Sequence, residues 1–264
     1  MNIRFILQIA GMFLFPLLVV LIPIYIGQRY GIYRSRKSDD MQHTPVGTVV
    51  GSTFGLLAFM LAFTFQIVTN RYDTRKELLV DEVTNIRTTY LRAGLIPEPF
   101  RTGSRKLLVE YVDLRILLVN DLSKIGTVRM RSQQILDTLW KYSEKLGGLD
   151  RSSENYALFI SSVNDLVENY NQRITMAFEF RIPVVILWAL FIITFFSMLA
   201  LGYQFGISGK GSFRINLLLG IIFAVVMFLI IALDRPETGL AQVNQKPMFT
   251  LQHQLQEMQL NTEK

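Results

Sequence analysis

The chain has 264 residues, half of them hydrophobic, no cysteine and a formal net charge of +6. The lack of cysteine excludes disulfides, cysteine-ligated zinc and thiol catalysis. The apolar residues gather near both ends and thin out in the middle, which predicts an integral membrane protein with basic residues beside its spans. No basic-aromatic face or known motif accompanies the positive charge, so we do not expect nucleic-acid binding.

The first apolar run covers residues 5–26 and is long enough to cross a bilayer, which takes roughly twenty apolar residues. The alternative is a signal peptide, but the run is too long for one and lacks a small-residue cleavage site, so we expect a membrane anchor. The second span covers residues 46–69. No Pro or Gly lies between Gly55 and Gly94, which predicts one continuous helix over residues 46–92 that projects well beyond the membrane.

Prolines 97 and 99 mark a turn, after which apolar periodicity predicts three helices. They cover residues 98–122, the segment between Gly126 and Gly147, and a stretch from Ser152 that leads directly into the third span at 182–204. The fourth span follows at 215–233, and the polar tail holds one weakly amphipathic helix after Pro247.

The predicted fold is therefore all-α: four transmembrane helices with a helical extramembrane domain inserted between spans two and three. We divide the chain at 1–70 (spans one and two), 71–181 (the extramembrane domain), 182–234 (spans three and four) and 235–264 (the polar tail).

Basic residues in the two short loops between spans bear on the orientation in the membrane. These loops hold Arg29, Arg34, Arg36, Lys37, Lys210 and Arg214. The short segments on the other side hold Arg4, Arg235 and Lys246. By the positive-inside rule, the loops are expected to be cytoplasmic, and the middle domain extracytoplasmic, in a multi-pass protein of the plasma (inner) membrane.

The sequence holds no constellation that we interpret as catalytic or metal-binding. Its two histidines, His43 and His253, have no acidic or histidine partner at metal-ligand spacing. We interpret the glycines at 206, 209 and 211 as turn residues between two spans. We therefore expect neither enzyme activity nor a cofactor.

One face of the second span carries small residues at spacings of three and four and ends in an amide. Two phenylalanines lie beside it. The set is Gly51, Gly55, Ala58, Phe59, Ala62, Phe63 and Gln66. One interpretation is close helix packing, because small residues let helices approach in lipid. The other is a face that lines a narrow pore in an oligomer, where apolar constrictions can gate conduction. Both interpretations hold if the second spans of several subunits pack in a ring.

Charged residues follow this face and recur after the fourth span. They are Arg71, Asp73, Arg75, Asp81, Glu82, Asp234 and Arg235. Charges at this spacing on a long helix usually form a solvated, mutually paired surface. The functional alternative for the first five is a charged vestibule. Asp234 and Arg235 most simply end a helix at the membrane interface, and the functional alternative for them is a contact with a neighbouring subunit.

Several separated motifs resemble the bestrophin-like domain family. They are Gly55-Leu56-Leu57-Ala58-Phe59, Leu61-Ala62-Phe63-Thr64-Phe65, Arg71-Tyr72-Asp73-Thr74-Arg75, Leu95-Ile96-Pro97-Glu98-Pro99, Arg181-Ile182-Pro183 and Leu233-Asp234-Arg235-Pro236. The chain departs from the family at Thr84, where an asparagine is frequent. More distantly, the order of elements resembles that of true bestrophins, which are pentameric anion channels with a pore-lining second helix and a cytoplasmic middle domain.

The resemblance and the small-residue face lead to one functional hypothesis. We expect a homo-oligomeric ion channel or pore in the lipid bilayer, with inorganic ions passing along the second span. The alternative is a non-conducting membrane scaffold or sensor that binds a protein partner through its helical domain. Fold similarity alone does not decide between them.

Overall fold

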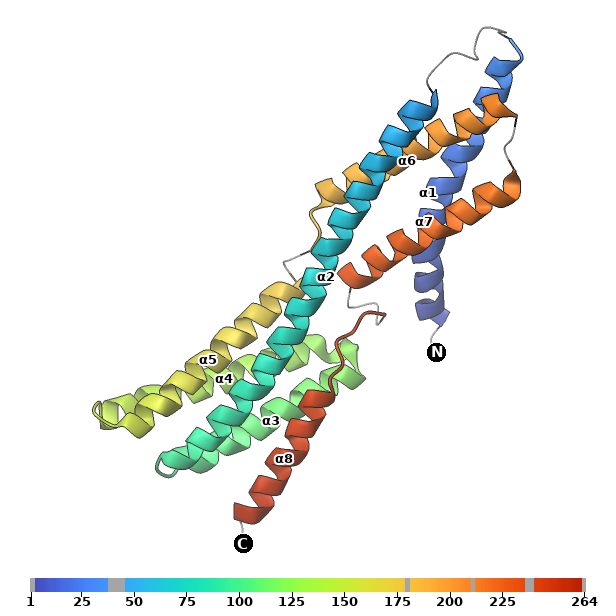
Figure 1. Cartoon of the computed structure of the whole chain (residues 1–264). Helices are drawn as coiled ribbons and strands as arrows, with labels where there is room; N and C mark the ends of the chain where they lie inside the picture. Colours follow the sequence, from blue (N-terminus) through green and yellow to red (C-terminus); the bar gives the residue numbers. More distant parts are fainter. Residues whose placement is uncertain (1–2, 38–45, 179–180, 210–211, 236–239, 263–264) are drawn as a thin grey trace. The chain divides into compact units, whose positions relative to one another are not determined.

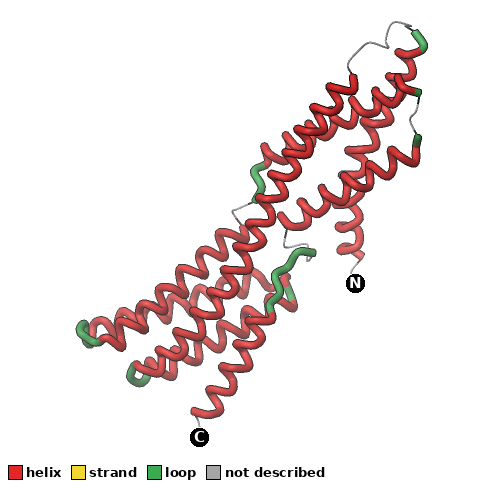
Figure 2. The backbone as a smooth tube through the Cα atoms, viewed as in Figure 1, coloured by secondary structure: helices red, strands yellow, loops and turns green. Residues whose placement is uncertain are grey.

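The predicted all-α fold is confirmed by a computed structural model, which describes residues 3–37, 46–178, 181–209, 212–235 and 240–262. Every regular element in these ranges is helical, as Figure 2 shows. The chain divides into two compact units. Residues 1–72 and 181–242 form the membrane unit, and residues 73–180 and 243–264 form the helical unit.

The membrane unit holds the four apolar helices, each long and apolar enough to cross a bilayer. They are α1 (Ile3–Ser35), the first part of α2 (Val46–Arg92), α6 (Val184–Ser208) and α7 (Phe213–Asp234) (Figure 1). Their inner surfaces share a core that includes Val20, Leu57, Leu190 and Met227. The chain is an integral membrane protein.

Helix α2 is the longest element, with 47 residues from Val46 to Arg92. This confirms the prediction of one uninterrupted helix through and beyond the second span. The reason is local: with no Pro or Gly after Gly55, nothing removes a backbone hydrogen bond or loosens the helix. A short 3₁₀ turn over Ala93–Leu95 ends it.

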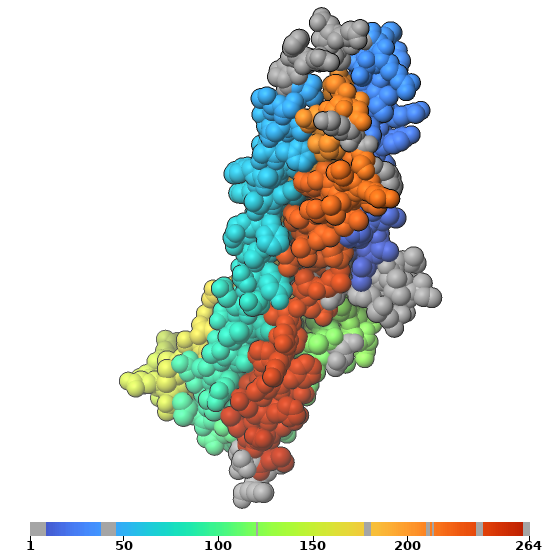
Figure 3. All heavy atoms as spheres, turned by 45° about the vertical axis from the view of Figure 1, so that its right-hand side comes forward, coloured from blue at the N-terminus to red at the C-terminus, as the bar shows by residue number. Residues whose placement is uncertain are grey.

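The helical unit is built from the second part of α2 with α3 (Phe100–Asn120), α4 (Ile125–Leu149), α5 (Glu154–Phe178) and α8 (Lys246–Thr262). Its core draws on every one of these helices and includes Ile86, Tyr90, Leu108, Tyr111, Leu136, Leu139, Phe159, Val163, Met248, Leu251 and Leu255. Helix α8 packs against α3, and Figure 3 shows it as an outer helix of this unit. The tail, expected as a separate polar segment, thus supplies part of the core.

Two local expectations differ from the structure. Helix α4 runs through Gly126, Gly147 and Gly148, which were expected to bound it. Neighbouring helices bury its apolar stripe, and that packing outweighs the roughly 1 kcal/mol that a glycine costs inside a helix. Helix α5 does not continue into the third span, because residues 181–183 are non-helical and α6 starts after Pro183. Proline lacks the N–H that a continuing helix needs.

Candidate functional site

The membrane part of α2 has one buried face and one open face. The buried face packs on the other spans through Val50, Leu57, Leu61, Thr64 and Val68. The open face carries all seven residues that the sequence singled out: Gly51, Gly55, Ala58, Phe59, Ala62, Phe63 and Gln66. Their side chains are exposed in the single chain, so this face is free to contact lipid, water or another copy of the protein.

The glycines of the open face make no close contact with other helices in the part of the chain that the structure describes. A methyl group added at Gly51 or Gly55 would meet nothing within 4 Å. Close helix approach occurs instead between α1 and α6. A methyl group at Gly202 would lie 2.1 Å from the Ile24 carbonyl oxygen, and one at Gly206 would lie 2.4 Å from that of Gln28.

Glycine spacing in the sequence is a signal for this α1–α6 contact, and Gly206, interpreted from the sequence as a turn residue, lies inside α6 instead. Gly27 and Gly31 are four residues apart on α1, and Gly202 and Gly206 are four residues apart on α6. Small residues at this spacing favour close helix packing in membranes. Within one chain, close packing through small residues therefore occurs between α1 and α6.

The open face ends in aromatic and amide groups. The rings of Phe59 and Phe63 stack with centroids 6.4 Å apart and an angle of 11° between their planes. One turn further, the Gln66 amide nitrogen donates to the Asn70 side-chain oxygen at 2.6 Å. An apolar stretch is thus followed by a polar pair of amides.

Asp234 fixes the end of α7 to two other parts of the membrane unit. Its Oδ1 pairs with Arg71 Nη1 at 3.2 Å and accepts the backbone N–H of Ile182 at 3.0 Å. Arg71 also donates to the Arg181 carbonyl at 2.8 Å. Asp234 was expected to end the helix or to contact a neighbouring subunit, and the structure pairs it with Arg71 of the same chain. Arg235 follows at the exposed C-cap of α7.

The next charges on α2 belong to the helical unit. Asp73 forms an exposed ion pair with Lys76 at 3.3 Å. Asp81 is exposed, while Arg75 is partly buried and interacts with other groups of the chain. These three residues lie on the helix that carries the open face.

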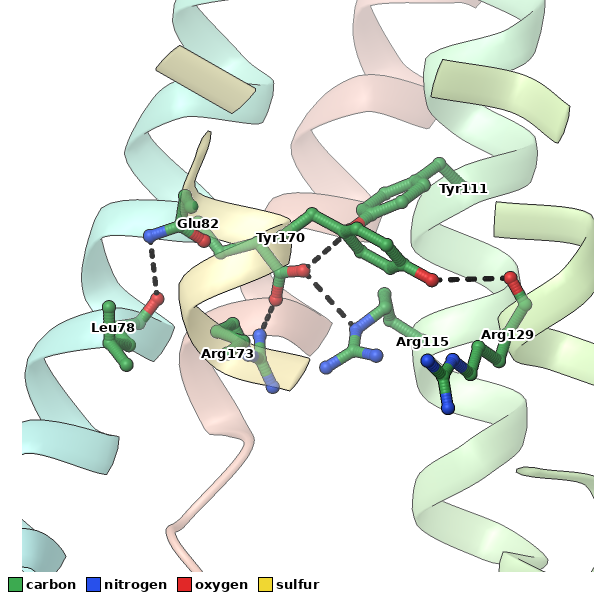
Figure 4. Close-up of polar contacts among 8 residues, drawn as sticks. Leu78, Glu82, Tyr111, Arg115, Arg129, Tyr170 and Arg173 are labelled. Carbon is green, nitrogen blue, oxygen red and sulfur yellow. Dashed lines mark hydrogen bonds and ion pairs between the residues drawn. The ribbon is translucent and has the colours of Figure 1, made fainter. Parts of the chain in front are cut away.

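Glu82 lies inside the helical unit rather than on a solvated surface. Its side chain is 0% exposed, and its Oε1 accepts the Tyr111 hydroxyl at 2.8 Å and pairs with Arg115 Nε at 3.3 Å. Arg173 pairs with the other oxygen. Figure 4 shows these side chains converging from α2, α3 and α5. A carboxylate away from water is tolerated only with such partners. The burial of Glu82 therefore does not match the interpretation of this residue as a vestibule charge.

Burial shifts the pKa values around Glu82, which with Tyr111, Arg115 and Arg173 we call the Glu82 cluster. It raises the pKa of Tyr111 to about 12, against the opposing effect of Arg115. It lowers the pKa of Arg173 to about 10. Tyr111 is therefore a neutral hydrogen-bond donor and Arg173 is charged at neutral pH.

Polar contacts extend the cluster. The Tyr170 hydroxyl donates to the Arg129 carbonyl at 3.2 Å, and the Asn169 amide donates to the Leu78 carbonyl at 3.3 Å. These bonds connect α5 to α4 and to α2.

In the part of the chain that the structure describes, no three His, Asp or Glu side chains gather as a metal site would require. The two features that could carry function are the open face of α2 and the Glu82 cluster.

Comparisons with known proteins identify relatives by family and by fold. The family model for the bestrophin-like domain matches residues 14–248. Solved structures of a bacterial bestrophin homologue from Klebsiella pneumoniae are similar at 14–15% identity. One covers 93% of this chain and 97% of its own with a TM-score of 0.61. A single-substitution variant of that homologue covers 95% and 97% with a TM-score of 0.64. A search of curated proteins found no match.

Proposed function

We propose that this chain, which belongs to the bestrophin-like domain family, forms a homo-oligomeric channel whose second span lines a path for inorganic ions. The observation that carries the proposal is the open small-residue face of α2, where an added methyl group at Gly51 or Gly55 would meet nothing within 4 Å among the described residues. The fold shared with bacterial bestrophin homologues is consistent with a protein of the channel type.

The chemistry of the open face suits a pore better than a lipid contact. Gln66 is exposed, and its bond to Asn70 uses only one of the hydrogen-bonding groups of the Gln66 amide. In the hydrocarbon region such groups are costly unless they face protein or water. A water-filled axis supplies those partners, and the amides can replace part of an ion's hydration. Phe59 and Phe63 then form the apolar constriction.

The charges beyond the membrane divide into two groups. The exposed carboxylates of Asp73 and Asp81 continue along α2, and we assign them with Arg75 to the vestibule. Arg71 and Asp234 pair with one another inside the chain, and Glu82 is buried. We assign these three to holding α2 in place, and Arg235 to the subunit boundary.

A tryptophan at Ala62 tests the pore assignment. Its bulk on a pore axis blocks the path, so current through planar bilayers should fall to background while the oligomer keeps its size. The matched control is Val185→Trp, which enlarges an exposed apolar position of α6 outside the proposed pore and should leave current unchanged. Normal current from an intact Ala62→Trp oligomer would sink the pore assignment. Loss of assembly would instead identify the face as a packing surface, because overpacking forces helices apart.

A non-conducting scaffold or sensor is the second candidate. It is favoured by two exposed apolar side chains on the part of α2 in the helical unit, Val80 at 53% and Leu91 at 50% exposure. The scaffold would be favoured if the purified wild-type oligomer carried no current at any applied voltage. It would also have to retain a protein partner through the surface around Val80 and Leu91.

A further inference from the structure

The Glu82 cluster contains more positive than negative charge. One carboxylate, Glu82, faces two guanidinium groups, Arg115 and Arg173. Tyr111 is the remaining contact of Glu82 and is neutral. In the described parts of the chain, neither arginine pairs with another acidic side chain. The cluster therefore keeps one uncompensated positive charge within the helical unit.

Most of the donors on these arginines are unused. A guanidinium has five N–H donors, and each arginine turns one nitrogen toward Glu82. In Figure 4 the remaining nitrogens of both side chains lie on the side away from the carboxylate. The two side chains are only 14% and 18% exposed, so they keep little contact with water. Withdrawing charged donors from water without supplying partners is costly.

We propose that the free edges of Arg115 and Arg173 bind a phosphate group. Two guanidinium forks from α3 and α5 offer the planar, bidentate geometry that oxyanions prefer, whereas a spherical halide uses only their charge. The bound anion completes the charge balance of the cluster and, with Glu82, ties α2, α3 and α5 together. This site is separate from the proposed ion path and does not depend on whether the protein conducts.

The lowered pKa of Arg173 agrees with this site. Burial removes water from the guanidinium and so disfavours its charged form. An anion at the free edge would supply the missing negative charge. The phosphate can come from free inorganic phosphate or from a lipid headgroup, which share this chemistry.

Thermal unfolding of the full-length protein in detergent tests the site. Sodium phosphate replaces sodium chloride at constant ionic strength, and phosphatidic acid added to the micelles forms the second arm. Binding to the folded state alone raises Tm in a saturable way, by roughly 3 °C or more at high occupancy. A rise with inorganic phosphate identifies a soluble ligand, and a rise with phosphatidic acid alone identifies a headgroup.

Three variants locate the effect. Arg115→Met should abolish the rise, and Arg115→Lys, which keeps the charge but loses the fork, should raise the half-maximal phosphate concentration roughly tenfold. Arg131→Met is the matched control, since Arg131 pairs bidentately with Glu110 at the surface of the same unit, and should keep the rise. The site is ruled out if the Tm of the wild type shows no saturable rise in either arm. An undiminished rise in Tm in both Arg115 variants would also rule it out. The Lys variant keeps the test valid if the Met variant fails to fold.

Discussion

A carboxylate inside a helical core needs partners that replace water, and Glu82 obtains them from side chains far away in the sequence. Tyr111, Arg115 and Arg173 lie on other helices of the unit. Removing one partner of such a group leaves a buried charge poorly compensated, which is why breaking buried ion pairs is strongly destabilising. The Glu82 cluster should thus be among the most sensitive positions of the helical unit.

We predict that Tyr111→Phe changes both the stability of the helical unit and its pH dependence. At neutral pH it removes a hydrogen bond to a charged acceptor, worth about 1.5–3 kcal/mol. In the folded protein the pKa of Tyr111 is raised to about 12, against 10 in the unfolded chain. Its contribution is therefore complete below pH 10 and is lost as pH rises to 12, at about 1.4 kcal/mol per pH unit.

Urea unfolding followed by circular dichroism, repeated from pH 9 to about pH 12, measures both effects. Stability of the wild type should fall with pH more steeply than that of Tyr111→Phe. Identical slopes for the two proteins would show that Tyr111 does not titrate differently in the folded state.

The burial of Glu82 was out of reach of the sequence. Asp81 and Glu82 are adjacent acidic residues on one helix, yet the first is exposed and the second fully buried. Which of the two turns inward depends on partners up to 91 positions away, from α3 and α5, and a single sequence does not reveal such pairings. The open face of α2 was recognisable because it depends only on spacing within one helix.

At the scale of elements, α1 and α6 approach closely only because glycines remove the side chains between them. We predict that Gly202→Ala is destabilising, because the added methyl group would lie 2.1 Å from a backbone oxygen of α1. Backbone cannot move aside as a flexible side chain does, so the two helices must separate. This should lower the free energy of unfolding by about 1–3 kcal/mol.

The matched variant Gly55→Ala adds the same methyl group on the open face of α2, where nothing lies within 4 Å. It should leave Tm unchanged or slightly higher, since alanine favours a helix over glycine. Thermal unfolding of both proteins in detergent compares them directly. An equal drop in Tm for Gly55→Ala would mean that another subunit packs tightly on that face.

The elements that sequence predicted well are those governed by local rules. Helix α2 follows from the lack of Pro and Gly between Gly55 and Gly94. Helix α8 shows the opposite case: its apolar residues form a weak pattern, and only the core of the helical unit explains why Leu251 and Leu255 are buried. Docking onto a distant helix such as α3 leaves little trace in the sequence of the tail itself.

For the whole molecule, orientation in the membrane determines what the helical unit can meet. The loops between spans hold six basic residues: Arg29, Arg34, Arg36, Lys37, Lys210 and Arg214. Anionic lipids and the insertion machinery favour keeping such loops in the cytoplasm. The resemblance to true bestrophins implies the reverse, with a cytoplasmic middle domain. The two arguments make opposite predictions for the same chain.

We predict from the loop charges that the helical unit lies outside the cytoplasm. A reporter that functions only in the cytoplasm should stay silent when it is inserted after Gly148, at the end of α4 in the helical unit. The same reporter inserted after Gly209, at the C-cap of α6 on the other side of the membrane, should be active. Each insertion controls for expression of the other, because the two reporters are expected to give opposite signals.

A strong signal at Gly148 with silence at Gly209 would reverse the orientation and place Asp73 and Asp81 at a cytoplasmic mouth of the proposed pore. The positive-inside rule would then be satisfied by Arg71, Arg75 and Arg181, which lie close to span ends on the helical side, rather than by the loop residues.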